Sequence, residues 1–229
     1  MKKFLPVALC VAALLAAALP GRAADVSRTT LISRLDTCEA ILQDIQSSTK
    51  TAIPREMFQR ARAIVIVNQV QAGFFVGVKD GYAVALVKRP NGQWSVPAFL
   101  NAGEASIGFQ AGARAINTVL LIMDDATVQL LLKRRFNIGL EAHAEAGIRT
   151  AEAQAVIRPL PAANVYVYGL QEGLYLSAAV KTGYMSPNDD ANRVFYNSNN
   201  RLPELLFSDW TTPPPEVHYL RDYLTRLSQ

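Results

Sequence analysis

The middle of this chain consists of short apolar runs separated by glycine and turn residues, and this pattern constrains the fold more than any other feature. The first such runs cover residues 63–67, 73–78 and 82–87. Runs of this length, bounded by turn residues, are typical of β-strands. Residues 88–93 contain an Asn-Gly pair, which predicts a hairpin that joins residues 82–87 to residues 94–100.

The second half of the chain continues the strand pattern and adds a short helix. Asp124 and Asp125 follow an apolar run, and acidic residues at this position suit the N-terminus of a helix because of its dipole. The expected elements are a strand at 119–123, a helix at 126–134 and strands at 136–145, 165–168 and 174–180.

Helices are expected at both ends of the chain. Between Leu31 and Ile45, apolar residues recur at steps of three and four, which predicts an amphipathic helix. This helix either packs on the core, which is the preferred interpretation, or lies on a membrane. Pro54 indicates a second helix start, and residues 215–227 a final helix. The fold class is therefore α+β, with a largely antiparallel twisted sheet, an N-terminal amphipathic helix, short internal helices and a C-terminal helix.

The first 23 residues read as a secretory signal peptide. Lys2 and Lys3 precede an uncharged apolar run at 4–19, and small residues favour cleavage after Ala23. The run is short for a membrane anchor, which needs about 20 apolar residues. We therefore expect residues 24–229 to form one domain in the periplasm or outside the cell.

Removal of this leader changes the charge and the cysteine content. The remaining chain has 20 basic and 19 acidic residues, so its net charge is about +1 and bulk charge gives no support to a nucleic-acid partner. Cys38 becomes the only cysteine, so no disulfide within the chain is expected.

Three glycine motifs follow one another in the central part, namely residues 72–74 with Gly77 and Gly81, residues 92–99 and residues 103–112. Each alone is weak, but several in order, with Trp-Ser-Val-Pro between them, are specific. The chain thereby resembles the SYLF domain family over roughly residues 30–200. Further similar segments lie at 138–140, 146–147, 168–175, Asn192 and 195–196.

The glycines of these motifs are expected to have a structural role. Gly73, Gly77 and Gly81 are spaced by four, so in strands they fall on one face, where a backbone or an apolar ligand can come close. Bending of the sheet is the preferred interpretation. The motif residues with an expected structural role are Gly73, Phe74, Gly77, Trp94, Pro97, Ser106, Gly108, Gln110, Gly112 and Gly173.

The SYLF resemblance implies a function in binding. Eukaryotic members of the family bind phosphoinositides, and fungal members also bind actin filaments, whereas bacterial members are commonly exported domains. For an exported chain the resemblance implies a non-catalytic domain that binds lipid or a membrane surface, with an anionic phospholipid as partner, and actin is not expected in this compartment. The alternative is a structural envelope protein that binds other proteins and has no lipid ligand.

No residue set in the sequence is a credible catalytic or metal site, and no cofactor is expected. Ser106 lies in a Gly-x-x-Ser-x-Gly segment, which lacks the glycine two residues before the serine that a nucleophile elbow needs. Glu141, His143 and Glu145 alternate on an expected strand, but strand geometry separates such side chains by about 7 Å. Solvent-facing alternation is the preferred interpretation of these three residues.

Basic residues at element ends are the candidate lipid contacts. The cluster at 133–135 ends the helix expected at 126–134, where cations also complement the helix dipole. Basic residues near a membrane surface contribute about 1 kcal/mol each to binding of anionic lipid. The candidate lipid-binding residues are Lys79, Lys88, Arg89, Lys133, Arg134 and Arg135.

Overall fold

The computed structural model describes seven segments of the chain, which are residues 26–47, 51–73, 76–107, 112–137, 144–146, 163–169 and 184–229. The expected signal peptide lies outside these described residues, as does the strand expected at 174–180. Four of the motif residues also lie outside them, namely Phe74, Gly108, Gln110 and Gly173.

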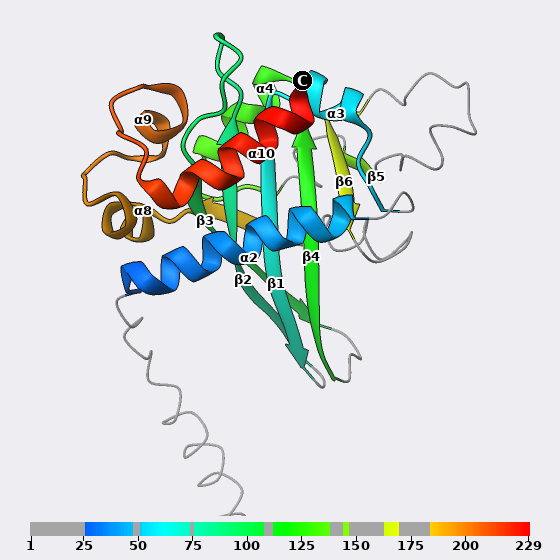
Figure 1. Cartoon of the computed structure of the whole chain (residues 1–229). Helices are drawn as coiled ribbons and strands as arrows, with labels where there is room; N and C mark the ends of the chain where they lie inside the picture. Colours follow the sequence, from blue (N-terminus) through cyan, green and yellow to red (C-terminus); the bar gives the residue numbers. More distant parts are fainter. Residues whose placement is uncertain are drawn as a thin grey trace, which may run out of the picture.

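The described strands form one seven-stranded sheet in the order β5-β6-β4-β1-β2-β3-β7 (Figure 1). All neighbouring strands are antiparallel except β5 and β6, which are parallel. The predicted α+β fold with a largely antiparallel sheet is thus confirmed. The strands are β1 Ala63–Gly73, β2 Val76–Val87, β3 Ala98–Ile107, β4 Gly112–Ile122, β5 Ala144–Ala146, β6 Val165–Gly169 and β7 Tyr184–Pro187.

The three short runs expected at 63–87 are in fact two long strands, β1 and β2. The prediction ended the first run at Val67 because polar residues follow it. In the structure Asn68 continues β1, and its side-chain amide donates to the Oδ1 of Asn117 on β4 at 3.0 Å. A polar residue is stable inside this sheet because its cross-strand partner is polar too.

Gly81 shows why the central strands need glycine. A Cβ atom added at Gly81 would lie 2.2 Å from the carbonyl oxygen of Asn68 and 2.7 Å from the Cα of Gln69, both on β1. The close approach of another backbone, one of the two uses expected for these glycines, therefore holds at this position.

The hairpin expected between residues 82–87 and 94–100 is confirmed. Lys88 and Trp94 form an antiparallel bridge, and the amide of Arg89 donates to the carbonyl of Gln93 at 2.8 Å. Gly92 has a φ of 80°, a backbone conformation that glycine adopts without steric cost.

Helices cover both faces of the sheet, and the alternation along β1 determines which residues they meet. Ile64 and Ile66 lie in one core cluster with α2 Arg28–Gln46, α3 Arg55–Arg60 and α10 His218–Ser228. Figure 1 shows α2 and α10 lying across the strands on this face. Because α10 follows the 3-10 helix η2 Pro215–Val217, the final helix expected at 215–227 is confirmed.

The other face of the sheet is covered by shorter elements. Val65 of β1 lies in the second core cluster, together with residues of α4 Asp125–Val128, the 3-10 helix η1 Gln129–Leu132 and α9 Leu202–Phe207. The helix expected at 126–134 is therefore two short consecutive helices. A further helix, α8 Asp189–Tyr196, contributes Phe195 to the first cluster.

The N-terminal helix α2 packs on the core, as preferred, and does not offer its apolar side to a membrane. Six of its side chains are between 0% and 3% exposed, namely Leu31, Leu35, Cys38, Ile41, Leu42 and Ile45. Arg28 fixes the start of α2, since its guanidinium donates to Glu216 Oε1 at 2.8 Å and to the carbonyl of Phe195 at 3.2 Å. Within the described segments, no helix has both the length and the apolar character that a membrane crossing requires.

Candidate functional site

Lys88, one of the expected lipid contacts, is bonded inside the protein. Its ammonium donates to the carbonyls of Phe58 and Gln59, at 2.7 and 3.0 Å, which lie in the last turn of α3. It also lies 5.0 Å from the centre of the Trp94 ring. Burial and, to a smaller extent, the charge of Arg62 lower the pKa of Lys88. This side chain therefore caps α3, where a cation complements the helix dipole.

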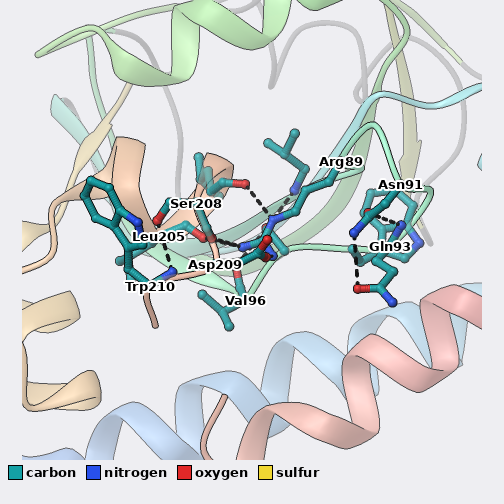
Figure 2. A network of polar contacts seen from close by, with 12 residues as sticks. Arg89, Asn91, Gln93, Val96, Leu205, Ser208, Asp209 and Trp210 are labelled. Carbon is teal, nitrogen blue, oxygen red and sulfur yellow. Dashed lines mark hydrogen bonds and ion pairs between the residues drawn. The ribbon is translucent and has the colours of Figure 1, made fainter. Parts of the chain in front are cut away.

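Arg89 is bonded in the same way to the end of α9. Only 10% of its side chain is exposed, and the guanidinium donates to the carboxylate of Asp209 and to the carbonyl of Ser208. The carbonyls of Leu205 and Leu206, both 3.5 Å away, also accept from it. Figure 2 shows these contacts converging on Arg89 from the loop after α9. Arg89 thus joins the β2–β3 turn to that loop.

The basic triplet Lys133, Arg134 and Arg135 lies on the surface directly after η1, and all three side chains are exposed. Arg135 has a fixed position, because its guanidinium carbon lies 3.8 Å above the ring centre of Tyr184 on β7. That ring in turn lies over Gly103 of β3, where an added Cβ would come within 2.9 Å of the Tyr184 hydroxyl. The stack places the basic triplet beside strands β3 and β7.

The last of the six candidates, Lys79, lies near the start of β2. Its backbone pairs with Gln71 on β1 and with Glu104 on β3. Lys79 thus belongs to a strand of the sheet, whereas the basic triplet follows η1. Lys88 and Arg89 make hydrogen bonds inside the protein.

Four of the motif residues form a row of small residues across the sheet. In the strand register, Gly73 of β1 lies opposite Gly112 of β4 and Gly77 of β2, and Gly77 lies opposite Ser106 of β3. Residues directly opposite one another in antiparallel strands share a face, so the expectation that Gly73, Gly77 and Gly81 fall on one face fits this register. Ser106 belongs to a strand rather than to the strand-to-helix turn of a nucleophile elbow.

Trp94 and Pro97 belong to the framework around the C-terminal helix. Trp94 is 1% exposed, and its indole nitrogen donates to the Oγ of Ser228 at 3.2 Å. The Trp94 carbonyl accepts from the guanidinium of Arg221, while the Pro97 carbonyl accepts from the hydroxyl of Tyr196. The interpretation of Trp94 as a core aromatic fits these contacts.

Asn192 has a role that the sequence alone did not reveal. Its side chain is fully buried on α8 and faces β3, where it accepts from the amide of Phe99 at 2.7 Å and donates to the carbonyl of Phe99 at 3.1 Å. The amide group thereby makes the two bonds that a neighbouring strand would make. The available signal was an asparagine within the apolar side of a helix.

Two exposed aromatic residues were also missed. Trp210, in the loop after α9, is 75% exposed, and Phe207, at the end of α9, is 43% exposed. We call these two residues the aromatic edge. The sequence signal was a tryptophan within a loop rich in proline, serine and threonine.

The described residues offer little for catalysis. Cys38 is fully buried, and burial raises the pKa of its thiol, which opposes formation of a thiolate. In the part of the chain that the structure describes, no three His, Cys, Asp or Glu side chains are grouped so that they could hold a metal ion. Glu141 and His143 lie outside that part, and Glu145 lies in β5.

Comparison with known proteins identifies the family. Residues 103–227 match the family described as "Ysc84: Las17-binding protein actin regulator". This match extends through the C-terminal helix, beyond the extent of roughly residues 30–200 expected from the motifs. The family description names a binding protein and regulator.

Relatives with curated names are similar over most of this chain. The bovine (Bos taurus) "SH3 domain-containing YSC84-like protein 1" is 26% identical over 165 residues, which are 70% of this chain and 48% of the relative. The human (Homo sapiens) protein of the same name is 25% identical and covers 71% and 47%. "LAS seventeen-binding protein 3" of Saccharomyces cerevisiae is 27% identical and covers 72% and 36%.

The chain thus spans about half the length, or less, of the curated relatives it matches. No solved structure matches it. The family match covers more than half of the chain, and the bovine and human relatives carry the YSC84 name. The chain therefore belongs to the Ysc84 family, whose shared domain is the SYLF domain.

Proposed function

We propose that this domain is a non-catalytic module that attaches to anionic membrane surfaces through the basic triplet Lys133, Arg134 and Arg135. The observation that carries the proposal is the exposure of three consecutive cationic side chains after η1. At about 1 kcal/mol for each basic residue near an anionic surface, the triplet supplies about 3 kcal/mol of attraction at low salt.

Two acidic residues in or next to elements on the triplet's side of the sheet are paired with basic residues outside the triplet. Asp125 is paired with Arg62 at 2.8 Å, and Asp209 is paired with Arg89. The basic triplet therefore remains a local positive site on a domain whose mature net charge is only about +1.

The expected export determines which membrane the domain meets. The segment 1–23 supports secretion, so the proposed location is the periplasm and the proposed ligand is an anionic phospholipid of the cell envelope. Actin, named in the family description, is not a proposed partner in that compartment.

A protein partner is the second candidate. The yeast relative is named for binding another protein, LAS seventeen, and the family description names the same activity. Carried over to this chain, those names favour a module that binds an envelope protein and has no lipid ligand.

Vesicle sedimentation separates the two candidates. Residues 24–229 are mixed with neutral phosphatidylcholine vesicles or with vesicles that also contain phosphatidylglycerol, over a salt series. The variant K133Q/R134Q/R135Q should lose about tenfold or more of its affinity for anionic vesicles at low salt, whereas the control R55Q/R60Q/R226Q removes the same charge from exposed positions on α3 and α10.

The result decides in either direction. If the two triple variants bind equally well, the basic triplet is ordinary solvated surface. If the parent protein does not sediment with anionic vesicles at all, the lipid proposal is wrong and the protein-binding candidate replaces it.

A further inference from the structure

The aromatic edge presents large apolar side chains to solvent at a defined place. Trp210 is 75% exposed, and it is the most exposed of the large apolar side chains among the described residues. Phe207 lies three residues before it at the end of α9 and is 43% exposed. An exposed tryptophan forgoes the free energy of apolar burial, so contact of these side chains with an apolar surface would be favourable.

The backbone on both sides of Trp210 is held in place. Before it, Arg89 binds the carbonyl of Ser208 and the carboxylate of Asp209, as Figure 2 shows. After it, Thr211 is 9% exposed, and its hydroxyl accepts from the side-chain amide of Asn200 at 2.8 Å. The loop is therefore braced while the indole stays outside, which lowers the conformational entropy that a contact would cost.

The aromatic edge and the basic triplet belong to the same side of the sheet. Leu205 and Leu206 of α9 lie in one core cluster with Leu131 of η1, which directly precedes the triplet. Helix α9 contacts β2 and β3, η1 contacts β7, and β3 pairs with β7. The aromatic edge and the basic triplet are thus attached to elements that cover the same face of the sheet.

We infer that Trp210 and Phe207 enter the interfacial layer of the anionic membrane whose headgroups the basic triplet contacts. This inference rests on the proposed function and assigns a second, apolar part to the same contact surface. Indole rings favour the membrane–water interface because they combine a large apolar body with one N–H donor. Apolar contact and attraction between cationic residues and anionic lipid together determine the affinity of interfacial proteins.

Charge distinguishes a membrane from a second copy of this chain as the occupant. A dimer formed through this face would bring two basic triplets toward each other, and like charges repel. An anionic bilayer instead attracts the triplet while it accepts the aromatic side chains, so it satisfies both parts of the surface.

The two tryptophans of the chain give a direct spectroscopic test. Trp94 is 1% exposed and Trp210 is 75% exposed, so their fluorescence reports on two different environments. Residues 24–229 and the variant Trp210→Phe are mixed with vesicles of phosphatidylcholine and phosphatidylglycerol. In the parent protein we expect a blue shift, protection from iodide, and quenching by lipids brominated in the acyl chain. The emission spectrum of Trp210→Phe should not change when vesicles are added.

Affinity is measured in the same samples by sedimentation, with a matched aromatic control. Trp210→Ser should weaken vesicle binding about tenfold or more and make the remaining binding more sensitive to salt. Tyr219→Ser removes an aromatic ring that is 55% exposed on α10, on the opposite face, and should bind like the parent.

Failure of this inference and failure of the proposed function give different results. If the parent sediments with anionic vesicles while its Trp210 emission is unchanged, or if Trp210→Ser and Tyr219→Ser bind alike, the aromatic edge does not enter the membrane although the proposed function stands. If the parent does not sediment, the proposed function is wrong and the inference is wrong with it.

Discussion

Replacement of Asn192 by leucine tests how α8 is attached to the sheet. The two side chains are similar in size, but leucine cannot make either of the hydrogen bonds to Phe99. The Phe99 carbonyl keeps one partner, because the amide of Asn188 also donates to it at 3.1 Å. The Phe99 amide, whose acceptor is the Asn192 Oδ1 at 2.7 Å, loses its partner at a buried position.

The expected change in the free energy of unfolding is the sum of these two effects. A buried donor left without an acceptor costs about 1–3 kcal/mol, and the lost bond to the carbonyl adds about 0.5–1.5 kcal/mol. We therefore expect Asn192→Leu to lower the free energy of unfolding by about 1.5–4.5 kcal/mol. In a chain of this size each kcal/mol shifts the melting temperature by roughly 2–4 °C.

Urea unfolding of residues 24–229 measures this change, with Asn199→Leu as the control at an exposed asparagine in the loop after α8. The control should change the free energy of unfolding by less than about 0.5 kcal/mol. If Asn192→Leu is as stable as the control, the two hydrogen bonds do not hold α8 and the explanation is wrong.

Asn192→Asp adds a pH dependence with a definite sign. A carboxylate at this fully buried position loses hydration and faces the Phe99 carbonyl, and these two effects outweigh the single hydrogen bond from the Phe99 amide, so its pKa in the folded state rises above the unfolded value of about 3.9. A group whose pKa is higher in the folded state contributes to the free energy of unfolding. This contribution is fully present below the unfolded pKa and is lost as pH rises through the folded pKa. The Asp variant should therefore approach the parent in acid and fall behind it at neutral pH.

Three further predictions concern single contacts. Gly81→Ala should lower the free energy of unfolding by about 1–3 kcal/mol in urea, because its Cβ meets the backbone of β1, and a variant as stable as the parent would contradict the geometry. The Cys38 thiol should be unreactive toward a disulfide reagent at pH 8 in the native state and react once the protein is unfolded, because burial raises its pKa; rapid native reaction would show that α2 opens. The hydrogen bond from Arg28 lowers the pKa of Glu216, so its stabilisation is present above pH 4.5 and is lost as pH falls through the folded pKa. Thermal melts should therefore separate Glu216→Gln from the parent at pH 7, the gap should narrow as pH falls through the folded pKa of Glu216, and a gap that does not change with pH would refute this linkage.

Local patterns in the sequence were sufficient for the fold class, for the hairpin and for the helices at the ends of the chain, but they divided β1 and β2 into three runs and did not predict β7. The spacing between Leu31 and Ile45 predicted α2 because six buried side chains follow the helical period. The Asn-Gly pair at residues 91–92 predicted the β2–β3 hairpin because only a few residue types favour such a turn.

The roles of Lys88 and Arg89 could not be predicted in this way. Their hydrogen-bond partners lie far away in sequence, at Phe58 for Lys88 and at Ser208 for Arg89. A basic residue in a turn has the same local pattern whether it reaches solvent or a helix end. The short helices α8 and α9 were missed for a similar reason, since their stability depends on packing against the sheet rather than on length.

These internal contacts change how binding experiments on the basic residues are interpreted. Neutralising Arg89 would remove the hydrogen bond to the Ser208 carbonyl and so release the loop that holds Trp210. Neutralising Lys133, Arg134 and Arg135 leaves that loop in place. A loss of vesicle binding in an Arg89 variant therefore reports on the hydrogen bonds that hold the loop after α9, whereas the same loss in the triplet variant reports on charge. The difference in vesicle binding between the triplet variant and the parent should disappear as salt rises, because screening removes the electrostatic contact from the parent too. The difference between the Arg89 variant and the parent should persist, because salt leaves a released loop unchanged.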